Sequence, residues 1–307
     1  MESGDCSGWT PLFCAAKIKN EAVVKLLPEK GADLNSTDTK SKTPLFSAAE
    51  GGSEAVTQYL LNSGAIVNAR ESSSTQTPLK YAILYKNDAA AKLLLGRGAE
   101  PKFESRGQTL LLWAAEYGLE ATVQLLLEKG IDFDLKDQDG RTLFSHAAEN
   151  GHEAIVGLLL ERGVDLGSKD SRGRTPLSWV LYGLEQYNAV NYPWKSTAAL
   201  RGYTAILRLL LEKTAKLPIR DAKYGQLQLS LAAKYEHQDI VKLLISKGVS
   251  VNWRDADGLT PLMRATERGQ AAIVSQLLRA GADIRTKSKQ SITALELADR
   301  KDYGGMV

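Results

Sequence analysis

The strongest constraint on the fold is a short motif that returns at a nearly constant period. Triplets of the form Thr-Pro-Leu, or variants of it, begin at residues 10, 43, 77, 109, 142, 175, 227, 260 and 293. Successive spacings are 33, 34, 32, 33, 33, 52, 33 and 33 residues. Such a period is typical of arrays in which each repeat is one supersecondary unit stacked on its neighbours. The sequence therefore predicts a single array over residues 1–307, with nine repeats, one of which carries an insertion.

Each repeat is predicted to contain a turn and two short helices, as the fifth repeat illustrates. Residues 137–141, Asp-Gln-Asp-Gly-Arg, favour a turn, and the Thr142 hydroxyl can cap the helix that follows. Gly151 is expected to end this helix, and Gly163 to end a second one. The second helix carries an apolar stripe at helical spacing: Ala154, Ile155, Leu158, Leu159 and Leu160. Neither helix can bury its apolar face alone, so stacking of repeats must complete the core.

Three segments resemble the ankyrin repeat: residues 170–177 (DSRGRTPL), 147–156 (AAENGHEAIV) and 31–35 (GADLN). The resemblance covers about residues 5–300. It implies an all-α solenoid in which hairpin tips form one rim of a concave groove, first helices line its floor and second helices form its back. One departure is the family's usual His after Thr-Pro-Leu, which is replaced by Phe13, Phe46, Lys80, Leu112, Ser145, Ser178, Ser230, Met263 and Glu296.

The groove floor of such an array is predicted to carry aromatic side chains. Four residues after the start of each triplet, on the groove side of the first helix, stand Cys14, Ser47, Tyr81, Trp113, His146, Trp179, Leu231, Arg264 and Leu297. One helical turn later the same face adds Tyr85, Tyr117 and Tyr235. With neighbouring helices about 8–10 Å apart, these rings would form an aromatic strip. The strip is interpreted either as a recognition surface or as packing between repeats.

The long spacing in the sixth repeat comes from an insertion at about residues 184–201. It contains Tyr187, Tyr192 and Trp194, and it falls between the two helices of the repeat. That connection is expected at the rim opposite the hairpin tips, so the insertion could form a lid or wall beside Trp179. A tolerated surface loop is the alternative.

Charged residues suggest a second pattern in the groove. Arg141 and Arg174, from two hairpin tips, could supply forked donors for a partner's carboxylate. Solvated pairs between the tips and the glutamates of the floor are the alternative, worth about 0–1 kcal/mol each. These floor glutamates are Glu50, Glu116, Glu149 and Glu267.

The search for catalytic and metal-binding motifs finds little. The sequence has no known nucleophile, zinc-protease, phosphate or dinucleotide motif, and no CxxC pair. If the protein is an enzyme, the candidates for acid/base chemistry are His146, Glu149 and Glu116. No metal and no cofactor is expected.

Composition limits the partners further. A formal charge of +3 gives no reason to expect nucleic acid. No apolar run of about 18 residues occurs, and the opening residues lack the pattern of a secretory signal, so we expect no membrane segment and an intracellular, cytoplasmic or nuclear, protein. The oligomeric state is not predicted. The first repeat starts without a polar cap and the last is incomplete, which suggests an excised portion of a longer protein or a naturally short ending.

These observations favour a non-catalytic binding scaffold that recognises a peptide or protein segment in an aromatic-lined groove. The alternative is a small-molecule-binding protein or an acid/base enzyme for cyclisation or isomerisation, with a site formed by the groove aromatics, His146 and the insertion. An open trough would favour the polypeptide and a deep covered pocket the small molecule. A structural or assembly role is a third possibility.

Overall fold

The computed structural model describes residues 7–72, 76–101, 104–105, 108–176, 179–180, 182–183, 202–203, 205–210, 229–230, 232–234, 236–255 and 257–300. It divides into two compact units, Met1–Arg174 and Thr175–Val307. Each unit is described by itself below.

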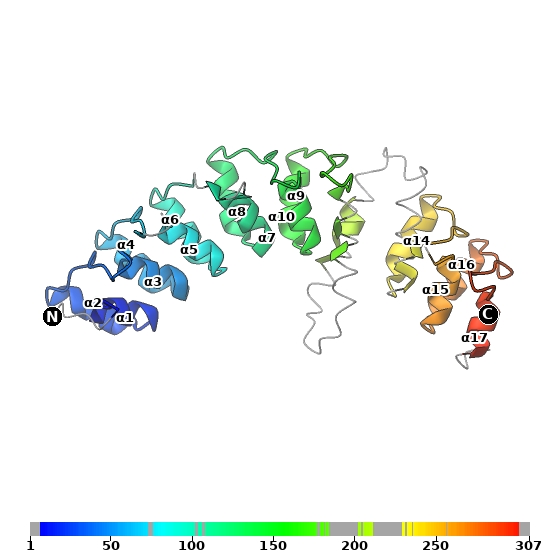
Figure 1. The fold of residues 1–307 in the computed structure, drawn as a ribbon, viewed down its shortest axis with the longest axis horizontal. Helices are drawn as coiled ribbons and strands as arrows, with labels where there is room; N and C mark the ends of the chain where they lie inside the picture. Colours follow the sequence, from blue (N-terminus) through cyan, green and yellow to red (C-terminus); the bar gives the residue numbers. More distant parts are fainter. Residues whose placement is uncertain are drawn as a thin grey trace. The chain divides into compact units, whose positions relative to one another are not determined.

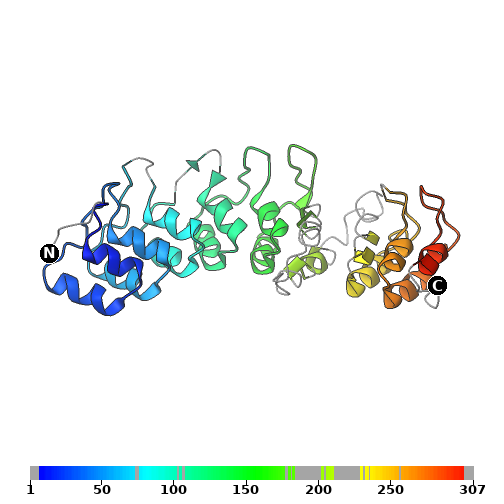
Figure 2. The ribbon, with the colours of Figure 1, turned by 60° about the horizontal axis from the view of Figure 1, so that its bottom comes forward.

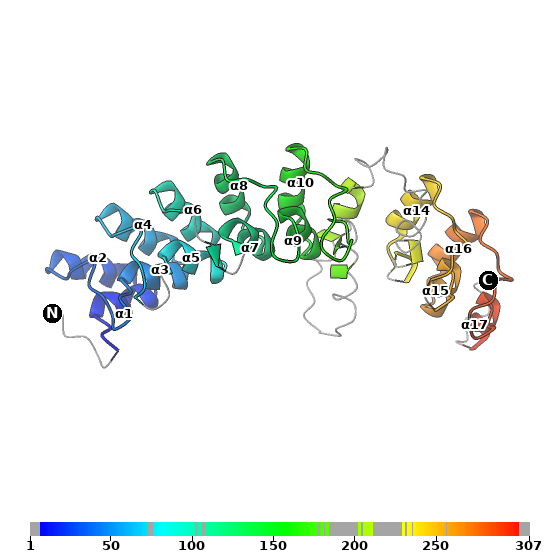
Figure 3. The same ribbon diagram turned by 45° about the horizontal axis from the view of Figure 1, so that its top comes forward.

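The described residues of the first unit form successive helix pairs arranged in two rows (Figures 1 and 3). The odd-numbered helices pack side by side in the inner row, and the even-numbered helices form the outer row. This arrangement confirms the expected two helices per repeat. The pairs are α1 (Pro11–Lys17) with α2 (Glu21–Glu29), α3 (Pro44–Gly51) with α4 (Glu54–Asn62), α5 (Pro78–Leu84) with α6 (Asp88–Gly96), α7 (Leu110–Tyr117) with α8 (Glu120–Glu128), and α9 (Leu143–Glu149) with α10 (Glu153–Glu161).

The triplets start the inner helices because their threonines act as caps. The Thr142 hydroxyl accepts a hydrogen bond from the backbone N–H of Ser145 at 3.2 Å, as predicted. Where proline follows the threonine, its missing N–H costs nothing, since the first helical N–H groups have no partner within the helix. Gly151 adopts the left-handed conformation after α9, with φ of 74°. Both ends of the helix therefore follow from local sequence.

Small side chains let the inner helices approach one another closely. Two consecutive alanines occur in most inner helices, and they are buried between neighbouring repeats. These alanines are Ala15, Ala16, Ala48, Ala49, Ala114, Ala115, Ala147 and Ala148.

Loops between repeats project from one side of the first unit (Figure 2). One of them contains the short antiparallel pair β1 (Glu104–Ser105) and β2 (Gln108–Thr109). In the following hairpin, the Asp137 carboxylate accepts hydrogen bonds from the backbone N–H groups of Asp139 and Arg141, at 2.9 and 2.8 Å. An aspartate that binds the backbone two and four residues ahead fixes a tight turn at the tip.

In the second unit, the bounded helices are α14 (Gln238–Ser246), α15 (Pro261–Glu267), α16 (Ala271–Arg279) and α17 (Ala294–Arg300). Helix α15 packs against α16 and α17, and α14 packs against α16. Thr260 caps α15 as Thr142 caps α9. The insertion at residues 184–201 lies outside the described residues.

Candidate functional site

Tyr81 on α5 and Tyr85, the C-cap residue that follows this helix, form an aromatic pair. Their rings stack with centroids 5.8 Å apart, and Tyr81 also contacts Phe46 of the preceding repeat edge to face. Tyr81 is buried, and its hydroxyl donates a hydrogen bond to Glu71 at 3.4 Å, whereas Tyr85 is 51% exposed. Tyr81 therefore packs between repeats and supports the exposed ring of Tyr85.

Lysines of the chain itself lie over four aromatic rings of the first unit. Cation–π contacts of this kind require the ammonium within about 6 Å of the ring centroid. The distances from Nζ to centroid are 4.2 Å for Lys17 over Trp9, 4.5 Å for Lys42 over Tyr81, 4.9 Å for Lys80 over Trp113 and 5.1 Å for Lys86 over Tyr117. Three rings of the predicted aromatic strip, Tyr81, Trp113 and Tyr117, therefore each have a lysine ammonium of the chain over one face. The strip combines apolar surface with positive charge.

Lys80 is buried and Lys42 is half-buried, and the pKa values of the two lysines shift in opposite directions. Burial lowers the pKa of Lys80, and the charge of Glu71 opposes this only in part. Burial also acts to lower the pKa of Lys42, but its interactions with Tyr81 and Glu71 outweigh burial and raise it. Lys42 Nζ lies 3.7 Å from Glu71 Oε1.

His146 on α9 is enclosed between two carboxylates. Its side chain is buried, with 2% of the residue exposed; Nε2 lies 2.9 Å from Asp137 Oδ2, and Nδ1 lies 3.8 Å from Glu116 Oε2. Burial, followed by the charge of Arg141, lowers the pKa of His146, while Asp137 opposes this. Burial raises the pKa of Glu116. His146 thus ties a hairpin tip to the floor and is shielded from solvent.

The two arginines proposed as carboxylate binders have carboxylate partners within the chain. Arg141 pairs with Glu149, and Arg174 Nε donates to Asp170 Oδ2 at 2.8 Å. Burial acts to raise the pKa of Asp170, but the hydrogen bonds from Arg174 outweigh it and lower the pKa. Arg141 thus pairs with a floor glutamate, as the alternative interpretation of the charge pattern expected, whereas Arg174 pairs with an aspartate of its own hairpin tip.

Sequence reasoning missed the tip acids that hold these side chains. An aspartate stands five residues before the triplet in several repeats, at positions 38, 137, 170 and 255. Asp137 binds His146, and Asp255 accepts a hydrogen bond from Arg264 Nε at 2.8 Å. The signal in the sequence is that these aspartates stand five residues before the first residue of a triplet, and their partners His146 and Arg264 stand four residues after it.

In the second unit, Trp179 is buried, with 3% of the residue exposed. Its ring packs edge to face on Tyr182, with centroids 5.4 Å apart. The remaining aromatic candidates lie outside the described residues, so their role stays a prediction: Tyr187, Tyr192, Trp194 and Tyr235.

A pocket of about 290 Å³, which we call the groove pocket, lies at the inner-row helices α1 and α3 of the first unit. Tyr85 forms part of its wall, and loop residues from the hairpin tip 38–42 line its edge. Its aromatic lining includes the stacked rings of Trp9 and Phe13, whose centroids are 5.3 Å apart. The groove pocket thus joins the exposed Tyr85 to the first two repeats.

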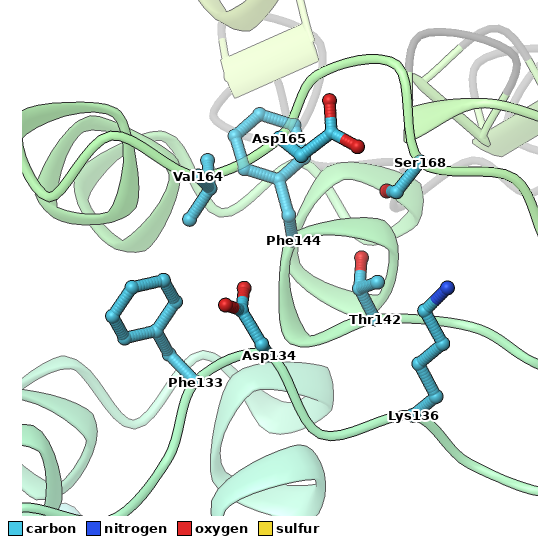
Figure 4. A pocket seen from close by; sticks show the side chains of 8 residues that line it. All are labelled: Phe133, Asp134, Lys136, Thr142, Phe144, Val164, Asp165 and Ser168. Carbon is cyan, nitrogen blue, oxygen red and sulfur yellow. The ribbon is translucent and has the colours of Figure 1, made fainter.

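A second pocket, of about 210 Å³, lies between two loops of the first unit (Figure 4). Asp134 from one loop and Asp165 from the next line it, and Phe144 lies behind them. We call it the loop pocket. Its polar side chains are mostly exposed, and it is separate from the groove pocket.

The loop pocket opens where a recurring tie between repeats is missing. Asn68 donates to the carbonyl of Gly98 at 3.2 Å and accepts from the N–H of Glu100 at 3.0 Å, so it joins its own loop to the next. Asn252 makes the same two bonds in the second unit. Asp134 occupies the equivalent position, four residues after the loop glycine, and in the described part of the chain its carboxylate makes no bond to the following loop.

Among the described residues, no group of three or more His, Cys, Asp or Glu side chains is arranged to hold a metal ion. No helix in the same residues is both long and apolar enough to cross a membrane.

Comparison with known families agrees with this architecture. A family model described as "Ankyrin repeats (3 copies)" matches residues 19–105, 68–137, 111–192 and 196–288. The chain belongs to the ankyrin repeat family. The repeats of this ankyrin protein thus extend over most of the sequence, including the region between the two sets of bounded helices.

Several curated ankyrin proteins are similar to parts of the chain. Human ankyrin repeat domain-containing protein 63 is 33% identical over 105 residues, which is 33% of this chain and 27% of that protein. Mouse protein phosphatase 1 regulatory subunit 12A is 36% identical over 86 residues, covering 28% and 8% of the two chains. Mouse B-cell lymphoma 3 protein homolog is 26% identical over 228 residues, covering 73% and 40%. In each case the match spans less than half of the relative's length.

Proposed function

We propose that this ankyrin repeat protein is a non-catalytic scaffold that binds a peptide or protein segment along the inner-row helices of its first unit. The observation that carries the proposal is the exposed ring of Tyr85, which rests on the buried Tyr81 beside the groove pocket. Exposed tyrosine rings that stack on a buried neighbour resemble the aromatic residues that often dominate binding energy at interfaces. Trp113 and Tyr117, each beneath a lysine, would extend this surface along α7.

The relatives support a role in protein assembly. Protein phosphatase 1 regulatory subunit 12A is, by its name, a subunit that acts with a phosphatase. We extend to this chain only the general idea of a scaffold for another polypeptide, acting within the cell as the sequence predicts.

The small-molecule or acid/base alternative has less support. A small-molecule site normally surrounds most of its ligand, whereas the groove pocket and the loop pocket are separate and partly open, with volumes of about 290 and 210 Å³. His146 is the proposed acid/base group, and both of its ring nitrogens face carboxylates in a buried setting. A substrate would have to displace these contacts to reach the ring.

Peptides selected from a random display library against the full chain test the proposal. We expect Tyr85→Ala to weaken a selected peptide by about tenfold or more, the effect of losing an interface anchor. The matched control is Tyr59→Ala on the outer-row helix α4, where the ring also reaches a neighbouring repeat through a hydrogen bond to the Lys25 carbonyl. Equal losses for the two variants, or no selected peptide at all, would refute binding on the inner row.

A further inference from the structure

Two lysines of the groove pocket have no acidic partner among the described residues. Lys17 and Lys40 both line it, and both are exposed. Within the described residues, neither ammonium group pairs with a carboxylate; Lys17 instead lies over the ring of Trp9. Two unpaired positive charges beside an apolar surface favour an anionic partner.

The pocket also contains a buried hydroxyl that has no hydrogen-bond partner in the described part of the chain. Ser47 on α3 is 1% exposed, and in the described part of the chain its Oγ makes no hydrogen bond. A buried hydroxyl left unsatisfied is unfavourable, and a serine hydroxyl can both donate and accept. Because Ser47 lines the groove pocket, a polar group entering from outside would satisfy it.

By contrast, the acidic side chains of the pocket are already engaged. Asp38 Oδ1 accepts from the backbone N–H groups of Lys40 and Lys42, both at 2.8 Å. Glu50 interacts with the hydroxyl of Tyr85, whose pKa is raised by burial and by this carboxylate. A cationic partner would therefore meet satisfied carboxylates and unpaired lysines, and the ring of Trp9 already carries a lysine.

On the basis of the proposed function, we infer that the groove pocket selects a polypeptide segment with an acidic residue next to an aromatic one. The acidic side chain pairs with Lys17 and Lys40, a polar group of the segment bonds to Ser47, and the aromatic ring packs on Tyr85. The volume of about 290 Å³ fits this occupant, because it lies at the lower end of ligand pockets and suits individual side chains.

The first part of the test is the composition of peptides selected by the full chain from a random display library. The inference predicts enrichment of Asp or Glu adjacent to Trp, Tyr or Phe. A selected peptide and its copy with the acidic residue changed to the amide are then measured by fluorescence anisotropy. We expect the amide copy to bind about tenfold more weakly at low salt, and the difference to shrink as salt rises.

The second part is a double-mutant cycle with the chain. The double variant Lys17→Met, Lys40→Met should weaken the acidic peptide about tenfold and leave the amide copy nearly unchanged. The matched control changes two exposed lysines of α2 and its C-terminal cap, Lys25→Met and Lys30→Met, and should leave both peptides unaffected. Thermal unfolding should be similar for all variants because these side chains are exposed.

The outcomes separate the inference from the proposed function. Selected peptides that depend on Tyr85 but show no acidic enrichment, or no coupling to Lys17 and Lys40, would overturn the inference and leave the scaffold intact. Failure to select any peptide, or binding that responds only to outer-row variants, would overturn both.

Discussion

Replacing Asp134 by asparagine should stabilise the first unit. The loop around Asp134 already has the geometry of the asparagine loops: its N–H binds Asp132 Oδ1 at 2.9 Å, as the N–H of Asn35 binds Asp33 Oδ1 at 2.9 Å. Asn68 binds the glycine of the following loop and the residue two positions after that glycine. At position 134, the asparagine side chain would correspondingly donate to the carbonyl of Gly163 and accept from the N–H of Asp165. It would also remove one of the two carboxylates that line the loop pocket.

The size of the effect follows from the two added hydrogen bonds. Each is worth about 0.5–1.5 kcal/mol, and these lie near the surface, so we expect a gain of about 1 kcal/mol in the free energy of unfolding. Urea titration followed by circular dichroism measures it, with the midpoint rising and the slope unchanged. Asn68→Asp is the matched control, and it should destabilise the protein by about 1 kcal/mol, because it removes the donor to the Gly98 carbonyl and places a carboxylate beside that oxygen.

Two results would refute this reasoning. If Asp134→Asn leaves the midpoint unchanged while Asn68→Asp lowers it, the loop after α10 does not offer the partners inferred from the register. If Asn68→Asp is neutral, the asparagine ties contribute nothing measurable and the origin assigned to the loop pocket is wrong.

Three other perturbations have defined outcomes. Burial is the largest cause of the lowered pKa values of His146, His152 and His237, so as the pH falls below about 7 the unfolded state binds protons before the folded state does. The free energy of unfolding should then fall by up to about 1.4 kcal/mol per pH unit for each histidine. The variant His146→Gln should flatten the plot of urea midpoint against pH, and an unchanged plot would contradict the assignment to His146. Gly52→Ala should destabilise the protein by about 2 kcal/mol or more, because a Cβ there overlaps the Asn87 side chain that binds two carbonyls of α3. Gly64 also has a left-handed backbone conformation but faces open space, so Gly64→Ala should cost only about 1 kcal/mol, and equal urea midpoints for the two variants would refute this difference. Joining Gly183 directly to Gly202, without residues 184–201, should leave a folded, cooperative chain, and an insoluble product would show that the insertion completes the core.

The sequence predicted the helices well because their boundaries depend on nearby residues. Thr142 caps α9, and the glycines after α9 and α10 adopt positive φ, as the local pattern required. The period then placed the helices in two rows, since each apolar face needs a neighbouring repeat. These features are encoded once per repeat, so a single sequence displays them many times.

The candidate site was harder to predict because exposure depends on side chains from other repeats. One column contains Tyr81, Trp113 and His146, yet Tyr81 and His146 are buried against tip acids, and Trp113 lies beneath Lys80 of the preceding repeat. Tyr85 one turn later retains exposed area. Position in the repeat identifies the face of a helix, and the lengths of neighbouring side chains decide what remains accessible.

Hydrogen–deuterium exchange of the full chain, with and without a peptide selected by display, tests the central claim most directly. A polypeptide bound on the inner row should slow exchange at residues 7–17, 38–50 and 77–87, which contain the groove pocket and Tyr85. The outer-row helices α2, α4 and α6 should show no comparable change. Protection confined to these outer helices, or to the second unit, would contradict the proposal that the inner-row surface of the first unit binds the partner.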